Sequence, residues 1–201
     1  MAATIWTYWF GVGLMILRVH RKSRRLGGLV PEQAVERLMW LVWVPLVTAW
    51  VMLPYLALVR RSPWLHPPAL ALTDPAYSGL RWVAGAIALI CLLLTAWCWA
   101  RMDGNWSMAV SEANRGELIA DGLFSRVRHP IYALSVTLMI CSLVIVPTLP
   151  MLVIAVVHIV LTQLKARNEE RHMLKMHGDA YARYLRRTGR FVPRLGAPRT
   201  A

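Results

Sequence analysis

The sequence predicts an all-α integral membrane protein with about five transmembrane helices, the last two forming a helical hairpin, followed by a cytosolic C-terminal helical tail. Three observations support this fold class. Of the 201 residues, 57% are hydrophobic, and the mean hydropathy of +0.46 is too high for an ordinary soluble protein of this size. Long apolar runs alternate with short polar segments. Basic residues gather on alternate polar segments, which is a signal of membrane topology.

The first half of the chain contains three of the apolar runs. Residues 5–19 form a short aromatic run that ends in a basic cluster at 18–25. Residues 38–59 are long enough to cross a bilayer, with kinks expected at Pro45 and Pro54. Residues 60–78 are rich in proline and predict a loop, and residues 80–100 predict a third span.

The second half predicts the hairpin and the tail. Residues 131–146 and 151–164 are apolar runs separated by a Pro-Thr-Leu-Pro break, and the second arm should continue into water as a helix to about residue 177. Gly178 suits the end of that helix, and Asp179 suits the start of the next, at about 180–187. Tyr181 and Tyr184 then share one helical face.

The basic residues predict the orientation. Segments 18–37, 101–128 and 165–199 hold 20 of the 23 Lys and Arg residues. With five spans, this places the N-terminus outside and the C-terminus in the cytosol. Arg outnumbers Lys 20 to 3, which indicates a GC-rich genome and therefore a bacterial inner membrane.

Charge and cysteine content restrict the possible functions. The net charge of +13 would suit a nucleic-acid-binding protein, but basic residues beside apolar helices are better explained by topology and anionic lipid, so we expect no nucleic-acid partner. Cys91, Cys98 and Cys141 lie inside apolar runs without CxxC spacing and are interpreted as core residues. Without an HExxH motif, no metal site is predicted.

Two polar segments are candidates for chemistry. Arg128 and His129 precede Pro130, a residue favoured in the first turn of a helix, at the start of a membrane run. The last membrane run ends in Glu169 and Glu170 on the same predicted side of the membrane. At helical spacing one stripe also faces the interior or a wet cavity: it comprises His158, Thr162, Lys165, Glu169 and His172. A second stripe comprises Gln163, Arg167 and Glu170.

These segments belong to a longer pattern. It comprises Gly104-Asn-Trp-Ser107, Glu117-Leu118, Gly122-Leu-Phe-x-x-Val-Arg-His-Pro-Ile-Tyr132, Glu169-Glu170, Leu174, Gly178-x-x-Tyr181-x-x-Tyr184 and Pro193. The pattern resembles the isoprenylcysteine carboxyl methyltransferase family and the related membrane phospholipid N-methyltransferases.

The resemblance implies one membrane methyltransferase domain over residues 1–201, with N-terminal membrane helices at 1–79 and a catalytic core and tail at 80–201. It implies S-adenosylmethionine as the cofactor, bound on the cytosolic side. The residues expected to bind it are Leu118, Gly122, Arg128, His129, Pro130, Tyr132, Glu169 and Glu170. Catalytic roles are expected for Arg128, Lys165, Arg167 and Glu170.

The cofactor's amino-acid end carries both charges, so a carboxylate and a cation side by side would suit it: Glu169 or Glu170 for the ammonium, Arg128 or His129 for the carboxylate. An amphiphilic or lipid-linked acceptor would enter from the bilayer, and a prenylcysteine-type carboxylate is favoured. Because Lys165 stands where the prenylcysteine enzymes resemble one another in carrying Arg, a phospholipid amine and a small thiol stay open as acceptors. A membrane sterol-type reductase and a non-enzymatic lipid-binding protein are the alternatives of other classes.

Overall fold

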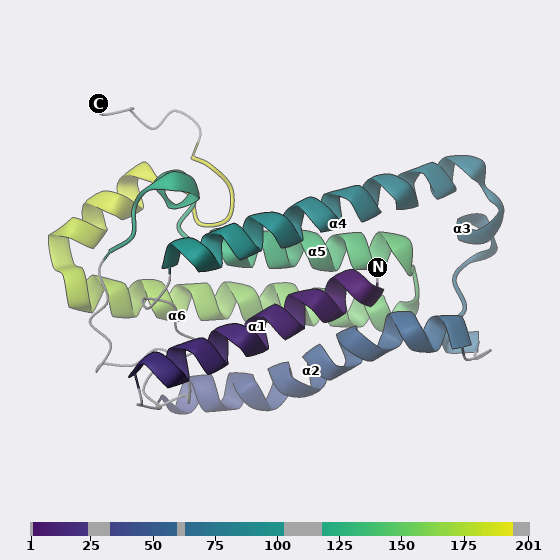
Figure 1. Cartoon of the computed structure of the whole chain (residues 1–201), viewed down its shortest axis with the longest axis horizontal. Helices are drawn as coiled ribbons and strands as arrows, with labels where there is room; N and C mark the ends of the chain where they lie inside the picture. The colour runs from purple at the N-terminus through teal and green to yellow at the C-terminus, as the bar shows by residue number, and fades with distance from the viewer. Residues whose placement is uncertain (1, 24–32, 60–62, 103–117, 195–201) are drawn as a thin grey trace.

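The computed structural model describes residues 2–23, 33–59, 63–102 and 118–194, and within these ranges every regular element is a helix. The elements are α1 (Ala2–Ser23), α2 (Ala34–Val59), η1 (Pro63–Leu65), α3 (Ala69–Thr73), α4 (Pro75–Met102), η3 (Gly122–Ser125), α5 (Pro130–Ile145) and α6 (Leu149–Arg187). The long helices lie side by side along the long axis of the molecule (Figure 1). The all-helical prediction is confirmed for the described residues.

Three helices in this part of the chain, α2, α4 and α6, are long and apolar enough to cross a membrane, and α5 is a shorter apolar helix. Large apolar side chains remain exposed on their outer faces, with Leu41, Leu58 and Trp82 at 73%, 82% and 80%. An apolar surface of this extent is suited to lipid rather than to water. These helices therefore fit an integral membrane protein, as the sequence predicts.

The interior of the bundle is packed from both halves of the chain. Helix α5 packs against α4 and α6, α2 packs against α6, and α1 contacts both α2 and α4. The buried Trp50 of α2 donates a hydrogen bond from Nε1 to Ser142 Oγ of α5 over 3.0 Å. Cys91, Cys98 and Cys141 are buried free thiols, which confirms their interpretation as core residues.

The predicted hairpin of α5 and α6 is present. Helix α5 begins at Pro130 and ends at Ile145. Three residues later Thr148 caps α6, its side chain accepting from the Met151 amide, and proline follows in the first turn. Pro150, the second proline of the break, therefore lies in the first turn of the second helix, where a residue needs no N–H donor.

Helix α6 changes direction at Gly178, whose φ of 49° is incompatible with a continuous right-handed helix. The segment after it folds back over the bundle (yellow in Figure 1). Tyr181 and Tyr184 are buried at 3% and 4% exposure, so they share an inward face, as their spacing predicts.

The loop prediction for residues 60–78 was wrong in part. Residues 69–73 form α3, and α4 begins at Pro75 rather than at residue 80. Asp74 explains the early start, because its Oδ1 accepts hydrogen bonds from the amides of Ala76 (2.7 Å) and Tyr77 (3.2 Å). An aspartate followed by proline is a helix-starting combination that the proline content concealed. Helix α2 continues through both Pro45 and Pro54.

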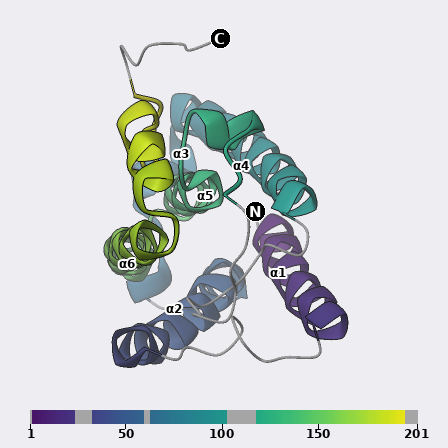
Figure 2. The ribbon, with the colours of Figure 1, turned by 90° about the vertical axis from the view of Figure 1, so that its left-hand side faces the viewer.

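One end of the bundle, on the left in Figure 1, collects the polar parts of the molecule. The end of α1, the start of α2, the end of α4, the start of α5 and the polar part of α6 meet there. Figure 2, which views the bundle from that end, shows α5 flanked by α4 and α6. The candidate residues at the start of α5 and on α6 are thereby brought to one place.

Candidate functional site

The Arg-His-Pro segment is attached to the chain after α6. Val127 and Gly189 form an isolated parallel bridge. The amide of Arg128 donates to Gly189 O (2.8 Å), that of His129 to Arg190 O (3.1 Å), and that of Gly189 to Arg126 O (3.1 Å). We call these two strips, residues 126–129 and 188–190, the tail clamp. It fixes the backbone on which Arg128 and His129 stand.

Arg128 directs its guanidinium into this clamp. Its Nε donates to Glu170 Oε1 over 2.9 Å, and Nη1 donates to the carbonyl oxygens of Thr188 and, at 3.3 Å, Leu185. The side chain is only 10% exposed. Arg128 therefore ties three segments together: the start of α5, the polar part of α6 and the tail.

Glu170 lies at the centre of the charged groups. Its carboxylate accepts from Arg128 and, through Nη2 at 2.5 Å, from Arg190, and His129 Nε2 lies 3.4 Å from Oε1. Burial alone would raise the pKa of Glu170. The polar contacts with His129, Arg190 and Arg128 outweigh burial, so the pKa of this carboxyl is well below its ordinary value. Glu170 is ionised and fully engaged.

Glu169 has a different environment. Its Oε1 accepts from the Tyr132 hydroxyl over 2.5 Å and lies 3.5 Å from Lys165 Nζ, and its Oε2 lies 3.5 Å from His129 Nδ1. The side chain keeps 24% exposure, against 9% for Glu170. His129 and Tyr132 stack with ring centroids 5.4 Å apart and 9° between planes. Glu169 is thus the carboxylate of the doublet that a ligand could reach.

The interior stripe predicted on α6 is confirmed for its three most deeply placed members, since His158, Thr162 and Lys165 are all buried. His158 Nε2 lies 3.1 Å from Ser135 Oγ of α5. Lys165 reaches the other way, with Nζ 2.5 Å from Glu36 Oε1 of α2. The stripe therefore links α6 to α5 in the membrane and to α2 at the polar end.

Other predicted residues stand apart from the charged cluster formed by Arg128, His129, Lys165, Glu169, Glu170 and Arg190. Arg167 is exposed on α6 and makes no hydrogen bond or ion pair with the described residues of the cluster. Leu118 is half-buried ahead of η3, and Gly122 has a φ of 55° with Trp97 beside it. Pro130 is buried at the first position of α5. Of the longer pattern, residues 104–107 and Glu117 lie outside the described residues.

Three residues that contact the cluster or hold its backbone were not predicted from the sequence: Glu36, Gly189 and Arg190. Glu36 is a carboxylate at the edge of an apolar run, a signal that deserved weight because ionisable groups beside membrane segments are costly. Arg190 is one of many arginines in a basic tail. Gly189 has no side chain to suggest a role, yet a Cβ there would overlap the Val192 carbonyl.

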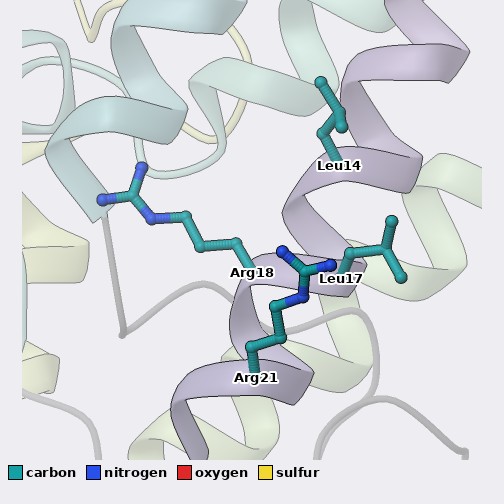
Figure 3. Close-up of a pocket in the computed structure, with 4 residues that line it drawn as sticks. All are labelled: Leu14, Leu17, Arg18 and Arg21. Carbon is teal, nitrogen blue, oxygen red and sulfur yellow. The ribbon is translucent and has the colours of Figure 1, made fainter.

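A separate pocket of about 470 Å³ lies on α1 and is lined by Leu14, Leu17, Arg18 and Arg21. Figure 3 shows the two arginines extending from successive turns of α1, with the leucines above and beside them. None of its lining residues belongs to the charged cluster. The pocket combines an apolar wall with two cations at the polar end of a helix.

The cluster can bind a small zwitterion. Glu169 offers an accessible carboxylate, and Arg190, 30% exposed, offers a guanidinium that is paired with Glu170. His129 Nε2 is buried, and although it lies 3.4 Å from Glu170 Oε1, it makes no hydrogen bond of good geometry with the described residues. A buried polar atom without a partner costs roughly 1–3 kcal/mol, so a bound polar ligand would stabilise this site.

A family model described as the isoprenylcysteine carboxyl methyltransferase family matches residues 75–175, half of the chain. The match begins at α4 and ends in the polar part of α6, so it includes the Arg-His-Pro and Glu-Glu segments. Glu36 and Arg190 lie outside it. A comparison with curated proteins found no match. The family match confirms the resemblance inferred from the motifs.

Proposed function

Because the chain belongs to the isoprenylcysteine carboxyl methyltransferase family, we propose that it transfers a methyl group from S-adenosylmethionine to a lipid-like acceptor at the cytosolic interface of a bacterial inner membrane. The family is one of methyltransferases, and the apolar helices fit an enzyme embedded in a membrane. The observation that carries the proposal is the charged cluster, in which the partly exposed Glu169 and Arg190 accompany a fixed carboxylate, Glu170.

The residues of the cluster fit the cofactor's amino-acid end. Glu169 would accept from the ammonium group, because it is the accessible carboxylate of the pair. Arg190 and His129 would bind the carboxylate, since one keeps 30% exposure and the other has a buried nitrogen that makes no hydrogen bond of good geometry with the described residues. Arg128 would mainly fix the site, because its Nε holds Glu170 and its Nη1 holds the tail. When bound, the cofactor supplies an electrophilic methyl group on a sulfonium.

The chain's own contribution is alignment. Tyr132 and His129, stacked and bonded to Glu169, hold the ammonium partner in one orientation. The tail clamp fixes His129 and Arg190 through the backbone. Holding two reactants in line can supply several kcal/mol of rate enhancement without a chemical group from the protein. An amine acceptor would need a base as well, whereas a carboxylate or thiolate would not.

Three acceptor classes are proposed, one ahead of the other two. A prenylcysteine-type carboxylate comes first, since the family description names carboxyl methylation. A phospholipid amine or small thiol comes second, and the pairing of Lys165 with Glu36 favours it, because that cation is already neutralised and does not attract an acceptor carboxylate.

The proposed topology has five spans, with α1 and α5 crossing as well as α2, α4 and α6. The N-terminus would lie outside and the C-terminus in the cytosol. Support comes from the distribution of Lys and Arg and from the gathering of the charged cluster at the end of the bundle where the basic segments lie (Figure 1). As a domain, the chain would be one unit over residues 1–201.

Calorimetric titration of the detergent-solubilised chain with S-adenosylmethionine, and separately with NADPH, tests the function. We expect saturable binding of S-adenosylmethionine alone, followed by transfer of its labelled methyl group to one of the three acceptor classes. Binding of NADPH without S-adenosylmethionine would contradict the proposal and favour a reductase. Binding of neither would favour a lipid-binding protein.

A further inference from the structure

Two buried charges join α2 to α6 beside the site. Lys165 Nζ lies 2.5 Å from Glu36 Oε1, and the two side chains are 2% and 0% exposed. Asn168 Nδ2 donates to Glu36 Oε1 over 3.3 Å and to Gln33 Oε1 over 2.9 Å. Burying two charges is expensive, so a pair this deep needs an explanation beyond stability.

Lys165 stands between two carboxylates. Glu36 Oε1 is 2.5 Å from its ammonium group, and Glu169 Oε1 is 3.5 Å away on the other side. Glu169 is the same carboxylate that the Tyr132 hydroxyl holds over 2.5 Å. A buried cation must be compensated by some anion. As long as Glu36 neutralises Lys165, Glu169 does not have to neutralise it and keeps its negative charge for a ligand.

We propose that Glu36 is a positioning residue of the cofactor site, which holds Lys165 and so keeps the charge of Glu169 available for an ammonium group. The inference rests on the proposed function, in which Glu169 binds the ammonium of S-adenosylmethionine. With Glu36 present, Glu36, Lys165 and Glu169 together carry one net negative charge. Without it, Lys165 and Glu169 cancel, and the attraction for an ammonium group is lost.

This role is distinct from a tie between helices. A tie would stabilise the bundle and would affect every ligand equally. A charge effect acts only on ligands that carry the ammonium group. S-adenosylhomocysteine and its analogue without the amino group differ in that group alone, so the ratio of their affinities isolates the effect of Glu36.

The test measures both affinities by calorimetric titration of the full chain in detergent. For Glu36→Gln we expect S-adenosylhomocysteine to bind about tenfold more weakly and the deamino analogue to change less than about twofold. Replacing Lys165 by methionine in the same variant should restore the affinity ratio, because the competing cation is gone. Asn168→Ala is the matched control: it removes the hydrogen bonds from α6 to Glu36 of α2 and to Gln33 just before α2 but removes no charge, and the ratio should stay at the wild-type value.

The outcomes separate the two proposals. If the wild-type chain binds neither ligand, the proposed function fails. If it binds both but Glu36→Gln weakens them equally, or weakens neither, Glu36 is only structural and the inference is overturned. If Glu36→Gln does not fold, Glu36→Asp keeps the charge but withdraws it by one methylene; its ratio should fall roughly threefold, and an unchanged ratio would overturn the inference.

Discussion

Replacing Gly189 by alanine should open the tail clamp while leaving the membrane helices intact. An alanine Cβ at this position would overlap the Val192 carbonyl oxygen and would lie 3.1 Å from the Arg194 amide. Both neighbours are backbone atoms, so the clash cannot be relieved by rotating a side chain. Backbone must therefore move, and we expect the strip 188–190 to be displaced from the Arg-His-Pro segment.

The magnitude follows from the bonds lost. Three backbone hydrogen bonds join the two strips, at 2.8, 3.1 and 3.1 Å, and each contributes roughly 0.5–1.5 kcal/mol. The clamp should thus lose about 1.5–4.5 kcal/mol, which corresponds to faster exchange of its amide hydrogens by about 10- to 1000-fold. Hydrogen exchange measured by mass spectrometry on peptides covering residues 126–132 is the assay.

Gly85→Ala and Gly13→Ala are the controls, because nothing lies within 4 Å of a Cβ built at either position. In a helix interior alanine is favoured over glycine, so these variants should be neutral or slightly stabilising. Wild-type exchange of residues 126–132 in Gly189→Ala would refute the reasoning and show that the tail does not hold the segment.

Other consequences can be tested on the same preparation. Glu170→Gln should lower the free energy of unfolding by about 2–4 kcal/mol, because two guanidinium groups lose their anion. The control Arg167→Gln, at an exposed position, should change this free energy by less than about 0.5 kcal/mol. Equal effects of the two substitutions would show that Glu170 does not stabilise the tail clamp. Because the folded-state pKa of Glu170 is lowered from 4.5, its contribution is present above that value and is lost as the pH falls. The difference in unfolding free energy between wild type and Glu170→Gln should therefore shrink as the pH falls below about 4.5, and a constant difference would exclude the carboxylate as its source. Cysteines introduced at the exposed His66 and Arg194 should label from opposite sides of intact cells, with position 194 cytosolic; labelling of both from one side contradicts five spans.

Much of the fold was predictable because hydrophobic periodicity and helix-end residues act locally. The hairpin was predicted from the Pro-Thr-Leu-Pro break at residues 147–150. The change of direction at Gly178 was predicted from a single glycine between two polar helical segments. The early start of α4 was missed because Asp74 acts through a cap that a proline-rich composition conceals.

The site was predictable only where its residues lie in motifs. Arg128, His129, Glu169 and Glu170 meet as expected. Which of these residues is paired within the protein and which is accessible depends on neighbours from elsewhere in the fold. Arg190 pairs with Glu170, so this carboxylate is occupied by charges of the protein itself. The spacing of the two residues in the sequence does not predict the pair, because 20 residues of kinked helix and tail separate them. Glu36 reaches Lys165 across 129 residues of sequence, so only the packing of α2 on α6 brings the pair together.

During protein synthesis the tail clamp imposes an order of events. Thr188 follows Arg128 by 60 residues, and a ribosome adding roughly 5–20 residues per second needs about 3–12 s for that stretch. In this interval α5 and the apolar part of α6 are synthesised before the carbonyl oxygens that hold Arg128 exist. The helices of the hairpin are therefore synthesised before the site can be completed, and a nascent chain arrested before residue 188 should lack the contacts of Arg128 with the tail.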